Sequence, residues 1–230
     1  MARLKSNLVD FALEEITRRI NNYDYSSGAI ISEVALAEEL KISRTPIREA
    51  ILKLIDIGIL ERTSTKVVVK AINLSDIHEI MQVREAIELM AAKIIIKAGG
   101  LSTEQFSALN SINENIIKSI SEGDFEKNFE QDCSFHEKLV EYAGNTRLID
   151  ICKRLNIQSR RFRWITMLTP ARYSNTVDEH KMILEGMLRN DIELASDALS
   201  AHVRQTYNNY KYILRDDKWI NMMRDLKGVN

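Results

Sequence analysis

Nearly unbroken helical periodicity is the feature that most restricts how this chain can fold. From Asn73 onward, apolar residues recur at the spacing of an amphipathic helix. Short breaks containing Gly, Pro or Asn divide this segment into six predicted helices, at 73–98, 102–121, 124–143, 146–168, 174–189 and 192–214, with 218–226 as a candidate for another. Short connections make consecutive helices antiparallel, so the sequence predicts an all-α antiparallel bundle over residues 73–230.

The first 72 residues have a different pattern. A helix is predicted over 3–22, a short helix begins after Ser32, and a second begins after Ser43 with Pro46 in its first turn. Both serines are predicted N-caps. The segment ILERTSTKVVVKAI then indicates two β segments around the polar tip TSTK. Three helices followed by a hairpin predict a winged helix-turn-helix domain over residues 1–72, and the whole chain is mainly α.

Charge along the chain favours nucleic-acid binding only in this first domain. The net charge of −1 gives no electrostatic case for the whole molecule, but residues 41–70 hold seven Lys and Arg against three acids. The side chains predicted to face DNA lie on the second short helix and on the wing; they are Arg44, Thr45, Arg48, Arg62, Thr65 and Lys66. Arginines at a helix start suit phosphates or guanine edges, although either one taken alone is better explained as a solvent-facing charge.

The histidines of the second domain form a candidate metal site. Asp132 and His136 are four residues apart, so they share one face of their helix. His180 precedes the break at 190–191 by about as many residues as His202 follows it, which places both about 15 Å from that turn. One carboxylate and three imidazoles at a common level suit zinc, nickel, iron, copper and sometimes manganese. Taken separately, each histidine is explained as a hydrogen-bonded or surface residue.

Arg84 is a second candidate, because it falls within an apolar stripe and has Glu88 one turn later. The pair is either an ordinary intrahelical ion pair or a sign that a buried guanidinium binds the carboxylate of a ligand. Ser159 lies on the inward stripe of its helix and is a further candidate for the ligand pocket, whereas Cys133 points away from Asp132 and is interpreted as structural.

Two segments resemble known families. LAEEL, SRTPIREAILKL and GILER are similar to the DNA-binding domain of GntR-type bacterial transcription regulators, and residues 73–214 resemble the FCD domain of the FadR subfamily. The first resemblance implies that Arg44 and Arg48 contact DNA. The second implies one metal ion per chain, commonly zinc, nickel or manganese, with an effector pocket that Arg84 faces. The implied ligands are Asp132, His136, His180 and His202. Two departures are Val34, where many members carry arginine, and a wing tip without glycine.

These observations predict a homodimeric transcription regulator, by default a repressor, that binds double-stranded operator DNA. A small carboxylate would act as its effector. The alternatives are a metal-dependent enzyme that acts on such an acid, and a regulator that responds to the metal itself. The charged N-terminus is unlike a signal peptide, and no apolar run approaches the roughly 20 residues that span a bilayer. A cytoplasmic protein without a membrane partner is therefore expected.

Overall fold

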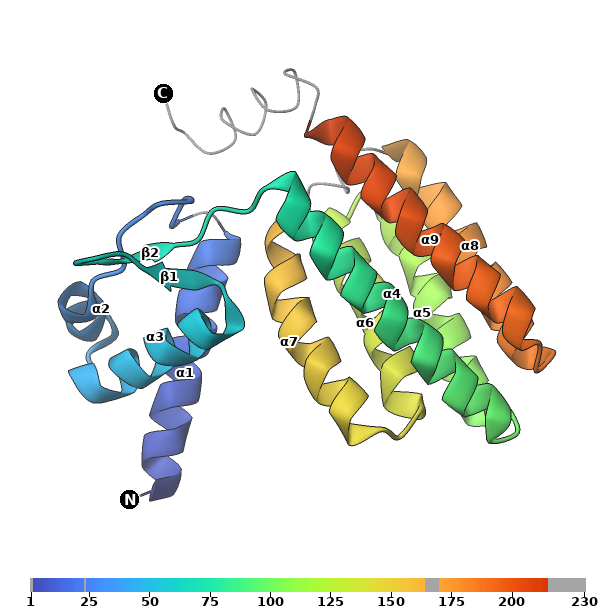
Figure 1. The fold of residues 1–230 in the computed structure, drawn as a ribbon, viewed down its shortest axis with the longest axis horizontal. Helices are drawn as coiled ribbons and strands as arrows, with labels where there is room; N and C mark the ends of the chain where they lie inside the picture. The colour runs from blue at the N-terminus through green and yellow to red at the C-terminus, as the bar shows by residue number, and fades with distance from the viewer. Residues whose placement is uncertain (1, 23, 164–169, 215–230) are drawn as a thin grey trace. The chain divides into compact units, whose positions relative to one another are not determined.

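The structure is a computed structural model, and it describes residues 2–22, 24–163 and 170–214 (Figure 1). The chain forms two compact units, Met1–Asn73 and Leu74–Asn230, and each is described by itself. Among the helices of the described residues, none is both long and apolar enough to cross a membrane.

The first unit is a winged helix-turn-helix, as predicted. Its elements are α1 (Ala2–Asn21), α2 (Glu33–Leu40), α3 (Arg44–Ile57), β1 (Leu60–Arg62) and β2 (Val67–Val69). The two strands pair antiparallel, with Leu60 opposite Val69. A single β-bridge from Ile30 to Val68 extends this hairpin, and helical or strand periodicity did not predict it because one isolated residue has no period.

The start of α3 corrects one prediction. Ser32 caps α2 by accepting a hydrogen bond from the Ala35 backbone, but the Ser43 side chain accepts no such bond within the described part of the chain. An N-cap oxygen normally binds the backbone N–H of the second or third helical residue. In α3 the third residue is Pro46, which has no N–H to donate.

The second unit is an all-α bundle, as predicted. Its helices are α4 (Leu74–Lys97), α5 (Thr103–Glu122), α6 (Phe125–Tyr142), α7 (Thr146–Arg163), α8 (Pro170–Leu188) and α9 (Ile192–Ile213). Pro170 begins α8 rather than preceding it, so the predicted start at 174 was four residues late. Proline suits the first helical position because that residue needs no N–H partner. Residues 164–168 and 218–226 of the predicted helices lie outside the described residues.

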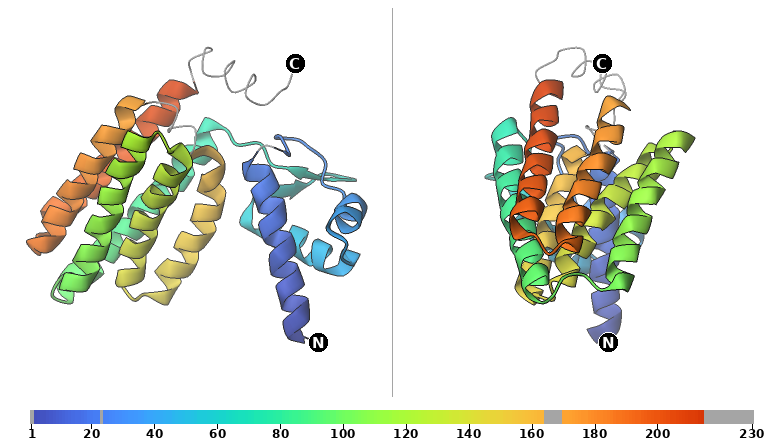
Figure 2. Two further views of the ribbon diagram at one scale, coloured as in Figure 1. Left: turned by 180° about the vertical axis from the view of Figure 1, so that it is seen from behind. Right: turned by 90° about the vertical axis from the view of Figure 1, so that its right-hand side faces the viewer.

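The turns of this bundle fix the direction of its helices. A Cβ atom at Gly100 would lie only 2.4 Å from the Asn190 side-chain oxygen, so the α4–α5 and α8–α9 turns meet at one end. Gly100 also has a φ of +92°, which favours glycine. The helices alternate in direction along the chain, so α4, α6 and α8 run parallel to one another (Figure 2).

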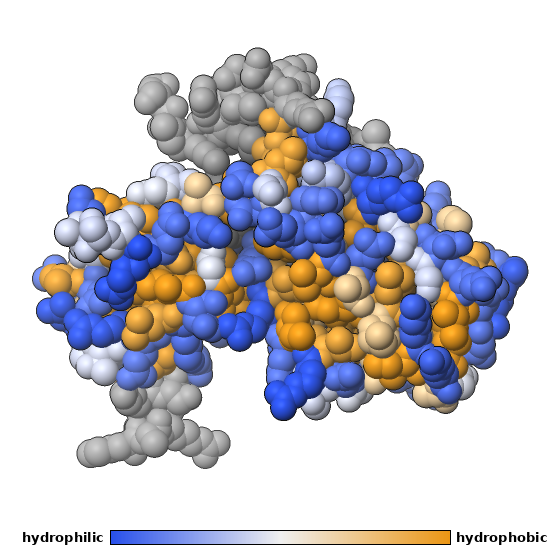
Figure 3. All heavy atoms as spheres, viewed as in Figure 1, coloured by the Kyte–Doolittle hydropathy of each residue, from blue (hydrophilic) through white to orange (hydrophobic). Residues whose placement is uncertain are grey.

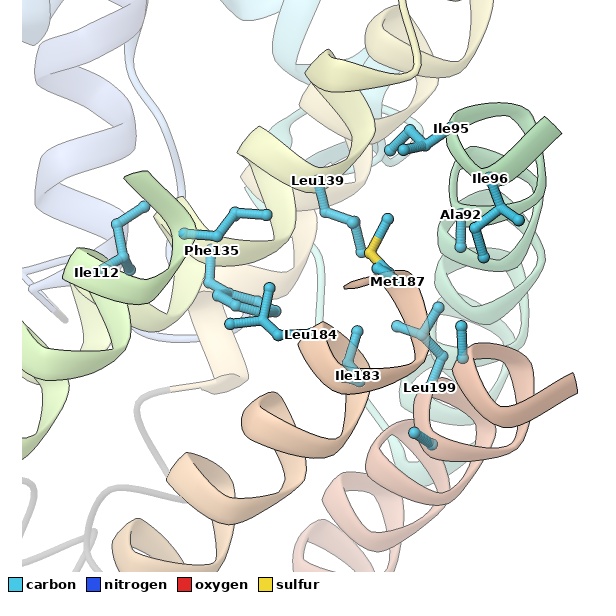
Figure 4. Close-up of a cluster of buried hydrophobic side chains, with 13 residues drawn as sticks. Ala92, Ile95, Ile96, Ile112, Phe135, Leu139, Ile183, Leu184, Met187 and Leu199 are labelled. Carbon is cyan, nitrogen blue, oxygen red and sulfur yellow. The ribbon is translucent and has the colours of Figure 1, made fainter. Parts of the chain in front are cut away.

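The core of the bundle holds α6, α8 and α9 close together. Phe135, Leu139, Ile183, Leu184 and Leu199 are fully buried in one cluster that also includes residues of α4 and α5 (Figure 4). The packing of α8 on α9 is especially close at Gly186, where a Cβ atom would lie 2.5 Å from the Ala195 backbone nitrogen. This close approach brings the histidines of the two helices within reach of one another.

Candidate metal centre

The structure brings together the four side chains that the histidine spacing singled out. Asp132 and His136 come from α6, His180 from α8 and His202 from α9, and one possible ligand atom from each lies within 4.8 Å of the others. The Nε2 atoms of His136 and His180 are 3.3 Å apart. The Asp132 Oδ1 atom is 3.6 Å from the Nε2 of His180 and 3.8 Å from that of His136.

Two carboxylates outside this set orient two of the imidazoles. The Nδ1 of His136 is 3.0 Å from Glu88 Oε2, and the Nδ1 of His202 is 2.7 Å from Glu179 Oε2. Because a carboxylate accepts, each Nδ1 donates its hydrogen, and each Nε2 then carries a lone pair towards the centre. Such carboxylate–histidine pairs commonly support metal-ligating imidazoles.

His180 is held by packing instead. Its ring stacks on Phe135 with the centroids 3.9 Å apart, and its Nδ1 is buried without a hydrogen-bond partner in the described part of the chain. Burial lowers the pKa of His180 well below its ordinary value. Burial, and secondarily the positive charge of Arg84, lowers the pKa of His136 in the same way. Both imidazoles are therefore neutral at pH 7, which is the form that binds metals.

The donor set fits a divalent transition metal ion. Two ligands that each bind at about 2.1 Å are roughly 3–3.5 Å apart, close to the separations of 3.3–3.8 Å among Asp132, His136 and His180, and all four ligand atoms lie within 4.8 Å of one another. Three imidazoles and one carboxylate are donors that zinc, nickel and manganese accept. The Asp132 side chain is 20% exposed, whereas the histidines are buried, so the carboxylate lies on the more accessible side of the cluster.

Arg84 forms the intrahelical ion pair with Glu88 that was one of the two interpretations from the sequence. Its side chain is only 6% exposed, and its Nε donates a 2.6 Å hydrogen bond to Glu88 Oε1 within α4. Its Nη2 is buried without a hydrogen-bond partner among the described residues. Glu88 thus joins Arg84 to His136 through its two oxygens, while one guanidinium nitrogen is left for another acceptor.

Ser159 lies at the level of Asp132. Arg160 on α7 forms a bidentate pair with Glu130 on α6, and Asn156 donates to Glu137, so the two antiparallel helices are aligned at these positions. Ser159 is buried, and its hydroxyl donates to the backbone oxygen of Asn156 at 3.3 Å. The structure therefore places Ser159 inside the bundle, with its own hydroxyl bonded within α7.

The predicted DNA-facing residues are all exposed on α3 and the hairpin; they are Arg44, Thr45, Arg48, Arg62, Thr65 and Lys66. Arg48 donates to Glu33 of α2 at 2.9 Å and 3.1 Å, and Arg44 approaches the same carboxylate at 3.5 Å. The hydrogen bond from Arg48 lowers the pKa of the Glu33 carboxyl.

Sequence reasoning missed Glu33 and Glu179, and it noted Glu88 only as the partner of Arg84. Each of these carboxylates bonds a residue on a different helix, and periodicity gives no signal for such a contact. The position of Glu179 directly before His180 was visible, but adjacent residues on a helix face different ways.

A winged helix with exposed arginines, joined to a helical domain that holds three buried histidines and an aspartate together, is the architecture of a DNA-binding transcription regulator. Family comparisons agree. Residues 8–68 match the gntR family of bacterial regulatory proteins, and residues 79–205 match the FCD domain. The chain therefore belongs to the GntR family of transcription regulators and carries a C-terminal FCD domain, as the resemblance implied.

Individual relatives agree with this assignment. The HTH-type transcriptional regulator YdhC of Bacillus subtilis is 25% identical over 89% of this chain and 91% of its own length. The gluconate operon transcriptional repressor of Bacillus licheniformis is 26% identical over 94% and 88%. The solved structure of Escherichia coli McbR/YncC superposes with a TM-score of 0.74 at 19% identity, covering 89% of this chain and 97% of that one, and it supports the fold alone. The matched families and relatives are transcription regulators rather than enzymes, which confirms the prediction of a regulator over the alternative of a metal-dependent enzyme.

Proposed function

We propose that this regulator is a repressor whose affinity for operator DNA is controlled by a small carboxylate bound at a metal ion in the helical domain. The observation that carries the proposal is the cluster of Asp132, His136, His180 and His202 together with the Nη2 of Arg84, which has no partner in the described part of the chain. The relative named as a gluconate operon repressor supports the repressor role, and the operon in its name is that of a carboxylate. A protein with this role works on DNA in the cytoplasm.

The winged domain would bind DNA through α3 and the hairpin. Arg44 and Arg48 would leave Glu33 to bind guanine edges or phosphates, with Thr45 beside them. The hairpin residues Arg62, Thr65 and Lys66 would contact the adjacent backbone or minor groove.

The helical domain would bind one divalent ion per chain, with zinc, nickel and manganese as the candidates. Asp132 and the three histidines would hold it, and Glu88 and Glu179 would keep two of the imidazoles in the ligating tautomer. The bound ion supplies a positive docking point for a carboxylate oxygen.

Arg84 would bind the same acid through its Nη2, because this buried nitrogen has no acceptor among the described residues and such a group favours an anion. α4 and α6 run parallel, and the contact between Glu88 and His136 sets their relative level. Arg84 and Asp132 each lie one turn before that contact, so they share a level inside the bundle. Ser159 is at this level too and would contact the acid after rotating its hydroxyl.

We also propose that the chain is a homodimer that uses the outer face of α4 and α7. Val83 and Met90 are 45% and 48% exposed on α4, and Ile151 is 44% exposed on α7. Figure 3 shows apolar side chains gathered over these two helices. A second copy is the occupant that this function requires, because two winged domains read two half-sites.

Analytical ultracentrifugation tests the dimer. Met90→Glu should shift the protein towards monomer, whereas Met182→Glu should not, because Met182 is similarly exposed but lies on α8. A monomeric wild type, or a Met90→Glu variant that remains dimeric, would contradict the assigned face.

The function itself is tested by combining three measurements on the purified protein. Elemental analysis gives the metal content, thermal-shift screening of small carboxylates finds the ligand, and gel shifts on the DNA flanking its own gene measure the response. We expect the acid to weaken DNA binding only when metal is present, because a ligand changes an equilibrium only by binding one state better. If DNA release followed metal concentration at a fixed acid concentration, the metal itself would be the signal.

A further inference from the structure

A buried asparagine next to the candidate metal centre has no role in the fold that the described contacts explain. Asn128 on α6 is 5% exposed, and its Nδ2 has no hydrogen-bond acceptor anywhere in the described residues. Buried amide donors are normally satisfied, so an exception needs a physical reason. Leaving such a group unpaired destabilises the fold, and a hydrogen bond to a ligand oxygen would recover that loss.

The position of Asn128 indicates where that oxygen would be. Asn128, Asp132 and His136 follow one another at intervals of four residues, so they form one stripe along α6. The core residue Phe135 lies beside this stripe, which shows that it faces the interior of the bundle. Asn128 is therefore one helical turn, about 6 Å along the axis, beyond Asp132 on the side away from His136.

Arg84 lies on the same side of the cluster. Glu88 of α4 contacts His136 of α6, and the two helices run parallel, so the turn that carries Arg84 is level with Asp132. The next turn of α6 carries Asn128. Two buried donors that have no acceptor among the described residues, Arg84 Nη2 and Asn128 Nδ2, thus lie on consecutive turns, on the side of the cluster where the half-buried Asp132 lies.

We propose that Asn128 is an effector-reading residue that donates a hydrogen bond to a second oxygen of the ligand, about one helical turn from the carboxylate bound at the metal. This inference rests on the proposed function and makes it narrower. The effector is then an acid that carries a hydroxyl, carbonyl or second carboxylate several ångströms from the first carboxylate, and a short monocarboxylate such as acetate leaves Asn128 unpaired.

Another buried asparagine provides a matched control. Asn156 on α7 is also nearly fully buried, but its Nδ2 donates to Glu137 at 2.8 Å. Its amide already has a structural partner. Replacing Asn156 by leucine should therefore lower stability without changing which acids bind, whereas replacing Asn128 removes a donor that no described residue uses.

The test measures the binding of a series of acids to zinc-loaded full-length protein by isothermal titration calorimetry. Acetate is compared with succinate, glutarate and gluconate, and zinc content is measured in each variant. The wild type should bind at least one longer acid tenfold or more tighter than acetate. Asn128→Leu should remove most of that preference while leaving acetate affinity and zinc content unchanged, and Asn156→Leu should keep the preference.

Asn128→Asp separates the kinds of ligand. The carboxylate introduced by this substitution would repel a second carboxylate of the ligand, so dicarboxylates should lose more affinity than gluconate, whose hydroxyls can donate to an aspartate. Asn128→Ser, which keeps a smaller donor, replaces the leucine variant if that protein does not fold.

Failure of this inference and failure of the proposed function give different results. If Asn128→Leu becomes more stable and keeps the preference of the wild type, the asparagine is only an unsatisfied core residue, and this inference is overturned while the proposed function stands. If the zinc-loaded wild type binds none of the acids, both are overturned.

Discussion

Glu88 should be indispensable both for the stability of the helical domain and for metal affinity, through two different contacts. Its Oε1 accepts from the buried Arg84, and its Oε2 accepts from His136. Glu88→Leu leaves the Arg84 guanidinium buried without its counter-ion, which costs about 3–5 kcal/mol in comparable buried pairs. At about 2–4 °C per kcal/mol for a unit of this size, the melting temperature of the metal-depleted protein should fall by about 6–20 °C.

The same substitution removes the acceptor that orients His136. Loss of such a partner typically weakens metal binding by about 10–100-fold. Competition with a chromophoric chelator measures this affinity directly, at a temperature where the variant is folded. Glu85→Gln is the control, because Glu85 is on the same helix but forms neither contact in the described structure.

A double variant separates the two effects. Arg84→Met/Glu88→Leu removes both charges of the pair, so most of the lost stability should return, because an apolar pair of similar volume replaces the ions. Metal affinity should stay low, because His136 still lacks its acceptor. A Glu88→Leu protein as stable as the wild type would refute the assigned pair, and a double variant with full metal affinity would refute the assigned support of His136.

Three further predictions concern the DNA-facing helix, the metal ligands and the buried histidines. Arg48→Ala should weaken operator binding by about 1–3 kcal/mol in a gel shift while leaving metal content unchanged, and wild-type affinity would contradict its assigned role. His202→Ala should abolish stoichiometric metal binding in elemental analysis, whereas His78→Ala should not, since His78 is exposed. The metal-depleted protein should lose stability as pH falls below about 6.5. The reason is that unfolded histidines then bind protons, while burial keeps the pKa of His136 and His180 lower in the folded state. Each contributes up to about 1.4 kcal/mol per pH unit in denaturant titrations, and a flat profile would contradict the lowered pKa.

Much of the fold could be predicted from the sequence because it depends on signals within single helices and turns. Gly123 ends α5 in the left-handed conformation that glycine adopts easily, so the predicted helix end at 121 was within one residue of the observed end. The common level of His180 and His202 followed from counting residues on either side of one turn. Both arguments need only the geometry of a single helix or hairpin.

The partners of those histidines did not follow, because they depend on how helices rotate against each other. Glu88 reaches His136 across α4 and α6, and Glu179 reaches His202 across α8 and α9. Spacing on one helix identifies which residues share a face, but it does not determine which neighbouring helix that face meets. Asn128 was missed for a related reason, since an asparagine within a helical pattern gives no sign that its amide is buried without a partner in the described structure.

The link through Glu88 has a thermodynamic consequence for the proposed sensor. An acid bound to both the metal and Arg84 contacts two groups that Glu88 connects, because one oxygen of Glu88 binds Arg84 and the other binds the metal ligand His136. Binding of the metal and binding of the acid should therefore strengthen each other. By linkage, the factor by which metal raises acid affinity must equal the factor by which acid raises metal affinity. Calorimetry in both orders of addition measures the two factors. In Glu88→Leu the shared carboxylate is gone, and each factor should approach the value set by direct contact of acid with metal. If the two factors are already equal to one in the wild type, acid and metal bind independently, and the proposed site is wrong.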